Sequence, residues 1–114
     1  MTHAGDVAKY RLVPKCAPIT PDGVKHVFSV DVEEWFQVGA FENTLSRSSW
    51  AELESRVVLQ TDKILSLLNT VNVKATFFCL GWVAQREPAL ITRISAAGHE
   101  IACHGMGHKR LYQM

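Results

Sequence analysis

The sequence predicts an α/β fold built on a parallel sheet, and three observations support this prediction. Three short apolar segments, at 26–32, 74–80 and 100–103, have the length and composition of strands. Two segments with helical spacing of their apolar residues separate them. Strand, helix, strand, helix, strand is the order of a parallel sheet whose crossovers are helices. The loops at the carboxyl ends of such strands are the expected walls of a site.

The segment 1–25 is expected to be a variable leader that precedes the domain. Proline and glycine interrupt it too often for a helix or a central strand, at Pro14, Pro18, Pro21 and Gly23. The predicted domain therefore spans residues 26–114.

The first strand and the first helix follow in that order. Residues 26–32 are β-branched and aromatic, which is typical of a strand. After a loop-like stretch, Ser49-Trp50-Ala51-Glu52 has the form of a capping box, which predicts a helix start. The apolar residues behind it keep helical spacing and predict a long amphipathic helix to about Asn69: Leu53, Val57, Ile64, Leu65 and Leu68.

The second half of the chain predicts a buried strand, a shorter helix and a last strand. Residues 74–80 are apolar on both faces, as in the middle of a parallel sheet. A helix is expected from Pro88, which suits the first helical position, to a stop at Gly98. Residues 100–103 form the third strand.

Composition and charge exclude several classes of protein. The 114 residues suit one small domain, and 47% hydrophobic residues exclude a wholly disordered chain. A net charge of +1 does not indicate the basic surface that binds nucleic acid, and the sequence has no polybasic run that would bind a membrane. No apolar stretch reaches the roughly 20 residues that span a bilayer, and residues 1–7 lack the pattern of a signal peptide. We therefore expect a cytoplasmic protein, with Cys16, Cys79 and Cys103 as buried free thiols.

Acidic residues gather where the first strand ends. Asp31-Val32-Glu33-Glu34 places three carboxylates within four residues, and their repulsion favours a bound cation or proton. A solvated acidic turn is the alternative interpretation. Asp31 also interrupts an apolar strand, where an unpaired carboxylate is costly to bury.

A histidine pair follows the third strand. His104 and His108 are four residues apart, so both imidazoles face one metal ion if the backbone coils helically. A chance pair is the alternative, because this chain has five histidines. Gly105 and Gly107 allow a sharp backbone turn between the two. His99 is expected to serve packing or hydrogen bonding.

The two clusters together predict a metal site. Both lie at carboxyl ends of strands in the same predicted sheet. A carboxylate with two histidines, and positions left open, is the ligand set of a catalytic Zn²⁺ or a similar divalent ion. A closed structural zinc site would need four ligands.

Three segments resemble the NodB-homology polysaccharide deacetylases, in the subgroup of exopolysaccharide and exosortase loci. They are Phe28–Phe36, Lys74–Phe78 and Gly98–His108. The resemblance implies a (β/α) barrel and metal-dependent hydrolysis of N-acetyl groups on an acetylated polysaccharide or oligosaccharide. The predicted fold class is thus the βαβαβ portion of a NodB-like barrel.

The resemblance also implies roles for four residues. Asp31 matches the family's general base, and His104 and His108 match its histidine metal ligands. Val32 stands where the family usually has a second Asp, so the acidic ligand is assigned to Glu33, with Glu34 left open. The ion is expected to be Zn²⁺.

The family's later Leu-x-His and Arg motifs do not occur in these 114 residues. We therefore expect an N-terminal part of a deacetylase domain, incomplete at its carboxyl end and inactive by itself, with its last strand at an unpaired edge. One alternative is a NodB-like hydrolase of small amides or imides. The other is a non-catalytic fragment that binds metal or glycan. No oligomeric state is predicted.

Overall fold

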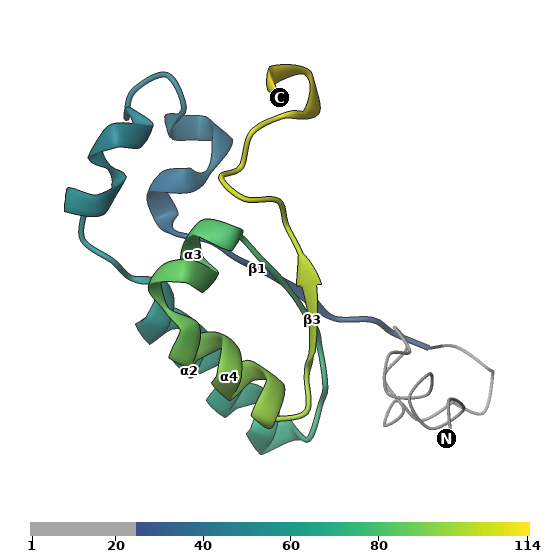
Figure 1. Ribbon diagram of the computed structural model, residues 1–114. Coiled ribbons are helices and arrows are strands. Elements are labelled where there is room, and N and C mark those ends of the chain that lie inside the picture. Colours follow the sequence, from purple (N-terminus) through teal and green to yellow (C-terminus); the bar gives the residue numbers. More distant parts are fainter. Residues whose placement is uncertain (1–24) are drawn as a thin grey trace, which may run out of the picture.

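The sheet has three parallel strands, as the sequence predicts. The structure is a computed structural model that describes residues 25–114, so the predicted leader lies outside the described residues except for Lys25. The strands are β1 (Ser29–Val32), β2 (Thr76–Cys79) and β3 (Glu100–Cys103), in the spatial order β1-β2-β3 (Figure 1). The α/β prediction is confirmed.

The register of the strands brings their carboxyl ends level. Val32 pairs with Cys79, and Cys79 pairs with Cys103. The loops that follow β1 and β3 therefore begin at the same edge of the sheet, with the loop after β2 between them. This places the acidic cluster and the histidine pair at one edge.

Helices cover one face of the sheet. Figure 1 shows α2 (Val57–Val71) and α4 (Pro88–Ala96) side by side there, and Arg93 of α4 forms an ion pair with Asp62 of α2 at 3.0 Å. Phe77 of the central strand is completely buried beneath them. The core around it is formed by apolar side chains from the strands, from α2 and α4 and from the segment that follows β2, including Val32, Leu68, Leu80, Val83, Leu90 and Ile94.

The predicted capping box is wrong, because α2 begins at Val57 rather than near Ser49. Residues Arg47–Glu52 form a 3₁₀ helix, η3, in which the Ser49 hydroxyl donates to the Ser46 carbonyl at 2.7 Å. Trp50 holds this segment in place, since its buried ring packs on Phe36 and Trp82 with centroids 5.9 and 5.6 Å apart. The free donors of α2 are met from elsewhere in the chain, as described below.

The remaining elements follow the sequence with small changes. Pro88 opens α4, and Gly98 lies just beyond its end with φ +87°, a conformation that favours glycine. Helix α2 ends at Val71, and Asn72 adopts the left-handed conformation at φ 55°. Helix α3 (Gly81–Arg86) was not predicted, because six residues are too few for a periodic pattern. Three further 3₁₀ turns, η1 (Trp35–Gln37), η2 (Gly39–Phe41) and η4 (Leu111–Gln113), lie in the loops.

The two described thiols differ in environment, so the expectation of buried thiols is only half correct. Cys79 is buried, and burial raises its pKa to about 11. Cys103 is exposed although it pairs with Cys79, because it lies at the end of the edge strand β3, which has no further strand beside it among the described residues. Cys16 lies outside the described residues. No helix in residues 25–114 is long and apolar enough to cross a membrane.

His99 serves hydrogen bonding inside the protein, as predicted. Its side chain is buried, and its Nδ1 accepts a hydrogen bond from the Ala75 N–H at 3.1 Å. Burial, and secondarily the positive charge of Lys74, lower the pKa of His99 below its ordinary value. The imidazole therefore stays neutral in the folded chain at pH values where it would be protonated in the unfolded chain.

This difference predicts a loss of stability in mild acid. Below a pH of about 6.5 the unfolded chain binds a proton at His99 that the folded chain does not, so unfolding becomes more favourable until the lowered pKa is reached. Urea unfolding of the metal-free chain between pH 7.5 and 5 should show this slope. His99→Asn keeps an acceptor at the δ position without titrating, so its slope should be shallower. Equal slopes in the two chains would contradict the assignment.

Candidate metal centre

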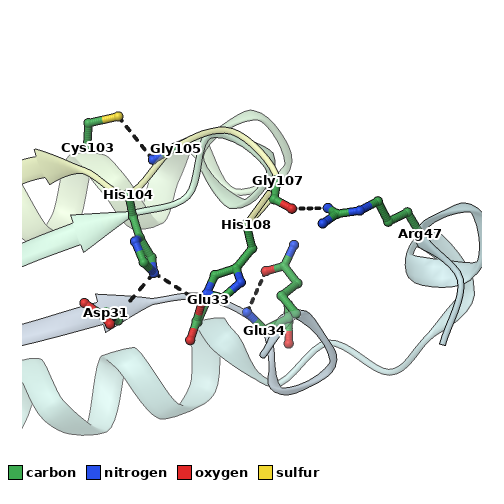
Figure 2. Close-up of polar contacts among 10 residues, drawn as sticks. Asp31, Glu33, Glu34, Arg47, Cys103, His104, Gly105, Gly107 and His108 are labelled. Atoms are coloured by element: carbon green, nitrogen blue, oxygen red, sulfur yellow. Dashed lines mark hydrogen bonds and ion pairs between the residues drawn. The ribbon is translucent and has the colours of Figure 1, made fainter. Parts of the chain in front are cut away.

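Three side chains from two distant segments converge at the carboxyl edge of the sheet. Oε2 of Glu33 lies 3.3 Å from Nε2 of His104 and 3.2 Å from Nε2 of His108 (Figure 2). One ligand atom from each residue can be chosen so that all three lie within 4.8 Å of one another. Glu33 follows β1, and the two histidines follow β3, so the level strand ends bring them together.

The histidines meet through an irregular loop rather than a helical turn. Gly105 and His108 adopt positive φ values of 77° and 59°, which are incompatible with a continuous right-handed helix. The two rings nevertheless face each other, with centroids 5.2 Å apart and planes nearly perpendicular. The predicted convergence is therefore observed, and the predicted helical backbone is wrong.

Helix α3 holds this loop in shape. The backbone N–H groups of Gly81 and Trp82, at its first turn, donate to the carbonyls of Gly105 and Met106 at 2.8 and 2.9 Å. The first N–H groups of a helix have no partner within the helix, so the loop satisfies donors that would otherwise need water. The helix that sequence analysis missed is thus the support of the histidine loop.

A second support comes from the segment between β1 and α2. The Arg47 guanidinium donates a hydrogen bond to the Gly107 carbonyl, one residue before His108. Arg110 forms an ion pair with Glu42 at 3.1 Å. These long-range contacts have no signal in the sequence, because the partners are about 60 residues or more apart.

The two adjacent glutamates, which the sequence left open as alternative ligands, point to different places. Glu34 is 1% exposed, and its carboxylate accepts hydrogen bonds from the Ser55 hydroxyl and from the N–H groups of Arg56 at 2.9 Å and Val57 at 3.3 Å. Its lone pairs are therefore used at the start of α2. Only Glu33 of this pair faces the histidines (Figure 2).

Asp31 lies at the edge of this group. Its Oδ2 is 3.8 Å from Nε2 of His104, and its side chain is 58% exposed. It is close enough to act on a molecule held at the three converging side chains, and it remains open to solvent. Asp31 is thus placed as a neighbour of the cluster rather than within its tightest part.

The cluster fits a divalent cation. Among the described residues, the buried Glu33 Oε2 and His104 Nε2 have no hydrogen-bond partner, although they lie close together. Bonds of about 2.0–2.1 Å at tetrahedral angles would put ligand atoms about 3.3 Å apart, which matches the two distances from Glu33. Cys103 turns away, with Sγ accepting from the Gly105 N–H at 3.3 Å (Figure 2). One carboxylate and two imidazoles leave positions free for a water or a substrate.

Comparison with known proteins identifies relatives that are named as deacetylases. Residues 55–114 match the family described as polysaccharide deacetylase. A peptidoglycan-N-acetylglucosamine deacetylase of Bacillus cereus is 42% identical over 48 residues, which are 42% of this chain and 22% of the relative. A chitooligosaccharide deacetylase of Sinorhizobium fredii is 45% identical over 51 residues, which are 45% of this chain and 24% of the relative.

A solved structure of a polysaccharide deacetylase has a similar fold. A crystal structure from Mycobacterium smegmatis, assigned to the polysaccharide deacetylases, has a TM-score of 0.61 and 29% sequence identity, over 90% of this chain and 37% of that one. The chain thus spans about a third of the solved relative and about a fifth to a quarter of the two curated ones. The family match covers more than half of the chain and includes both histidines of the site, so the chain belongs to the polysaccharide deacetylase family.

Proposed function

We propose that this chain carries the metal site of a hydrolase that removes N-acetyl groups from sugars in an acetylated polysaccharide or oligosaccharide. The observation that carries the proposal is the convergence of Glu33, His104 and His108 beside Asp31. The relatives named above act on N-acetylated glycans by their names, and family membership supports the same class of substrate.

Glu33, His104 and His108 would hold the ion, with zinc as the metal that suits this donor set best. When bound, a divalent ion lowers the pKa of a coordinated water and polarises an amide carbonyl. The chain itself contributes the positions of these groups: the strand ends lie level and so bring one carboxylate and two imidazoles together.

Asp31 would act as the general base. Its carboxylate lies next to the ligand cluster and is open to solvent, so it can accept the proton of the attacking water. The 114 residues contain no Leu-x-His motif. None of them is therefore assigned as the acid that protonates the leaving amine. For the 114-residue chain alone we expect metal binding without acetate release.

Asp31→Asn tests this proposal in a protein in which this sequence itself continues into one complete deacetylase domain, so that Asp31 is the base of that domain. Loss of the base should lower acetate release from N-acetylglucosamine oligomers by about 10²–10⁴-fold. The metal content should stay at that of the unsubstituted protein, because Asp31 lies outside the ligand group.

Two outcomes would contradict the proposal. Undiminished acetate release in Asp31→Asn would remove the base assignment. Turnover of small cyclic amides but not of acetylated glycans, by the unsubstituted protein, would favour a small-molecule hydrolase instead. A matched Asp62→Asn substitution serves as the control and should leave turnover unchanged, because Asp62 pairs with Arg93 between α2 and α4 and is not part of the cluster.

A further inference from the structure

We propose that Glu34 is a positioning residue: it anchors the loop after β1 to the start of α2 and so holds Glu33 against the two histidines. This inference rests on the proposed metal site. Among the described residues, Glu34 forms no hydrogen bond or ion pair with the histidines or with Asp31, and the inference assigns this second glutamate of the acidic cluster a role of its own.

The Glu34 carboxylate caps the start of α2. The helix has no side-chain cap of its own, since the residue before it, Arg56, provides none. The free N–H groups at a helix start and the helix dipole both favour a negative charge there. Glu34 supplies that charge from more than 20 residues earlier in the chain and accepts hydrogen bonds from two N–H groups and the Ser55 hydroxyl.

The backbone of Glu34 is also fixed, by two hydrogen bonds with Gln37. Its N–H donates to Oε1 of Gln37 at 2.8 Å, and its carbonyl accepts from the Gln37 N–H at 2.9 Å. Burial of this carboxylate would be costly without its partners, so the conformation that keeps all of them is strongly preferred. Side chain and main chain of Glu34 are thus both fixed.

Glu33 therefore lies between two residues, Val32 and Glu34, whose positions are both fixed. On its other side, Val32 is 1% exposed in the core, and its carbonyl accepts from the Leu80 N–H at 3.2 Å. Consecutive Cα atoms are only about 3.8 Å apart, so fixing Val32 and Glu34 leaves the backbone of Glu33 little freedom. The Glu33 side chain points to the histidines (Figure 2), whereas the Glu34 carboxylate is bound at the start of α2.

The experiment measures Co²⁺ binding to the 114-residue chain, by titration of the visible ligand-field bands and by competition with a chromophoric chelator. Glu34→Ala removes the cap and should lower Co²⁺ affinity by about 10–100-fold, the range for residues that orient metal ligands, and should shift the bands. Glu34→Gln keeps an acceptor oxygen for the helix N–H groups and should restore both affinity and spectrum to within about threefold of the original. Glu54→Ala, an exposed neighbour paired with Arg56, is the matched control and should change neither.

The outcomes separate this inference from the proposal on which it rests. Original affinity and spectrum in a folded Glu34→Ala chain would overturn the positioning role and leave Glu34 as a helix cap only. If the original chain itself binds no Co²⁺, the proposed metal site fails, and the inference fails with it. If Glu34→Ala does not fold, Ser55→Ala removes one of the donors instead, and an unshifted Co²⁺ spectrum in that chain would overturn the role.

Discussion

Replacing His104 with alanine should abolish metal binding at micromolar concentrations of the chain. The substitution removes one of the three converging side chains of the proposed metal site and leaves the buried Glu33 Oε2 with His108 as the remaining imidazole. We expect zinc affinity to fall at least about 100-fold, more than loss of an orienting residue costs. Competition with a chromophoric chelator measures this directly on the 114-residue chain.

His26→Ala is the control for this experiment, because His26 is exposed and precedes β1, whereas the cluster lies at the other end of that strand. Its zinc affinity should equal that of the original chain. Equal affinities in His104→Ala and His26→Ala would show that the metal, if bound, is held elsewhere. In a protein with a complete deacetylase domain, His104→Ala should also remove acetate release.

The second large effect concerns stability: Phe77→Ala should destabilise the chain by about 3–5 kcal/mol. Phe77 is completely buried in the central strand, beneath the helices, and contacts His99 with ring centroids 5.0 Å apart. Removing the ring leaves a cavity that rigid neighbours on both sides cannot fill. Because domains of this size are only marginally stable, most of the folded population should be lost.

Urea unfolding followed by circular dichroism measures this effect, in EDTA so that metal binding does not add to stability. Phe28→Ala is the matched control, since Phe28 is 48% exposed, and it should cost less than about 1 kcal/mol. A loss of similar size in both variants would contradict the position of the core described above.

The sheet could be predicted because its signals are local. Each strand is a short apolar run, and parallel order follows from the intervening helices, so the convergence of strand ends followed as well. For the same reason the acidic cluster 31–34 and the pair His104 and His108 could be named before the structure was known. The choice of Asp31 and Glu33 within the acidic cluster came from the family resemblance. His99 could also be predicted as a hydrogen-bonding residue, which its contact with the Ala75 N–H confirms.

The start of α2 could not be predicted, because its cap is not local. The Ser49-x-x-Glu52 pattern is a valid capping-box sequence, but it lies in a segment that forms a 3₁₀ helix around the buried Trp50 instead of starting α2. The residue that satisfies the helix donors is Glu34, which precedes the helix by more than 20 residues. The roles of the two neighbouring glutamates differ only through such tertiary contacts.

The histidine loop failed prediction for a related reason. A spacing of four residues suits a helix, but here the left-handed residues Gly105 and His108 shape the loop, and α3 and Arg47 support it. Nothing in residues 104–108 alone specifies those partners.

The strand order has a consequence for how folding and metal binding depend on each other. Glu33 follows one outer strand and the histidines follow the other, with β2 between them. The proposed metal site therefore forms only when both outer strands have paired with the central one. An ion that binds only the assembled sheet stabilises the sheet by mass action. Such an ion would link the two outer strands, and its free energy of binding would add to the free energy of folding.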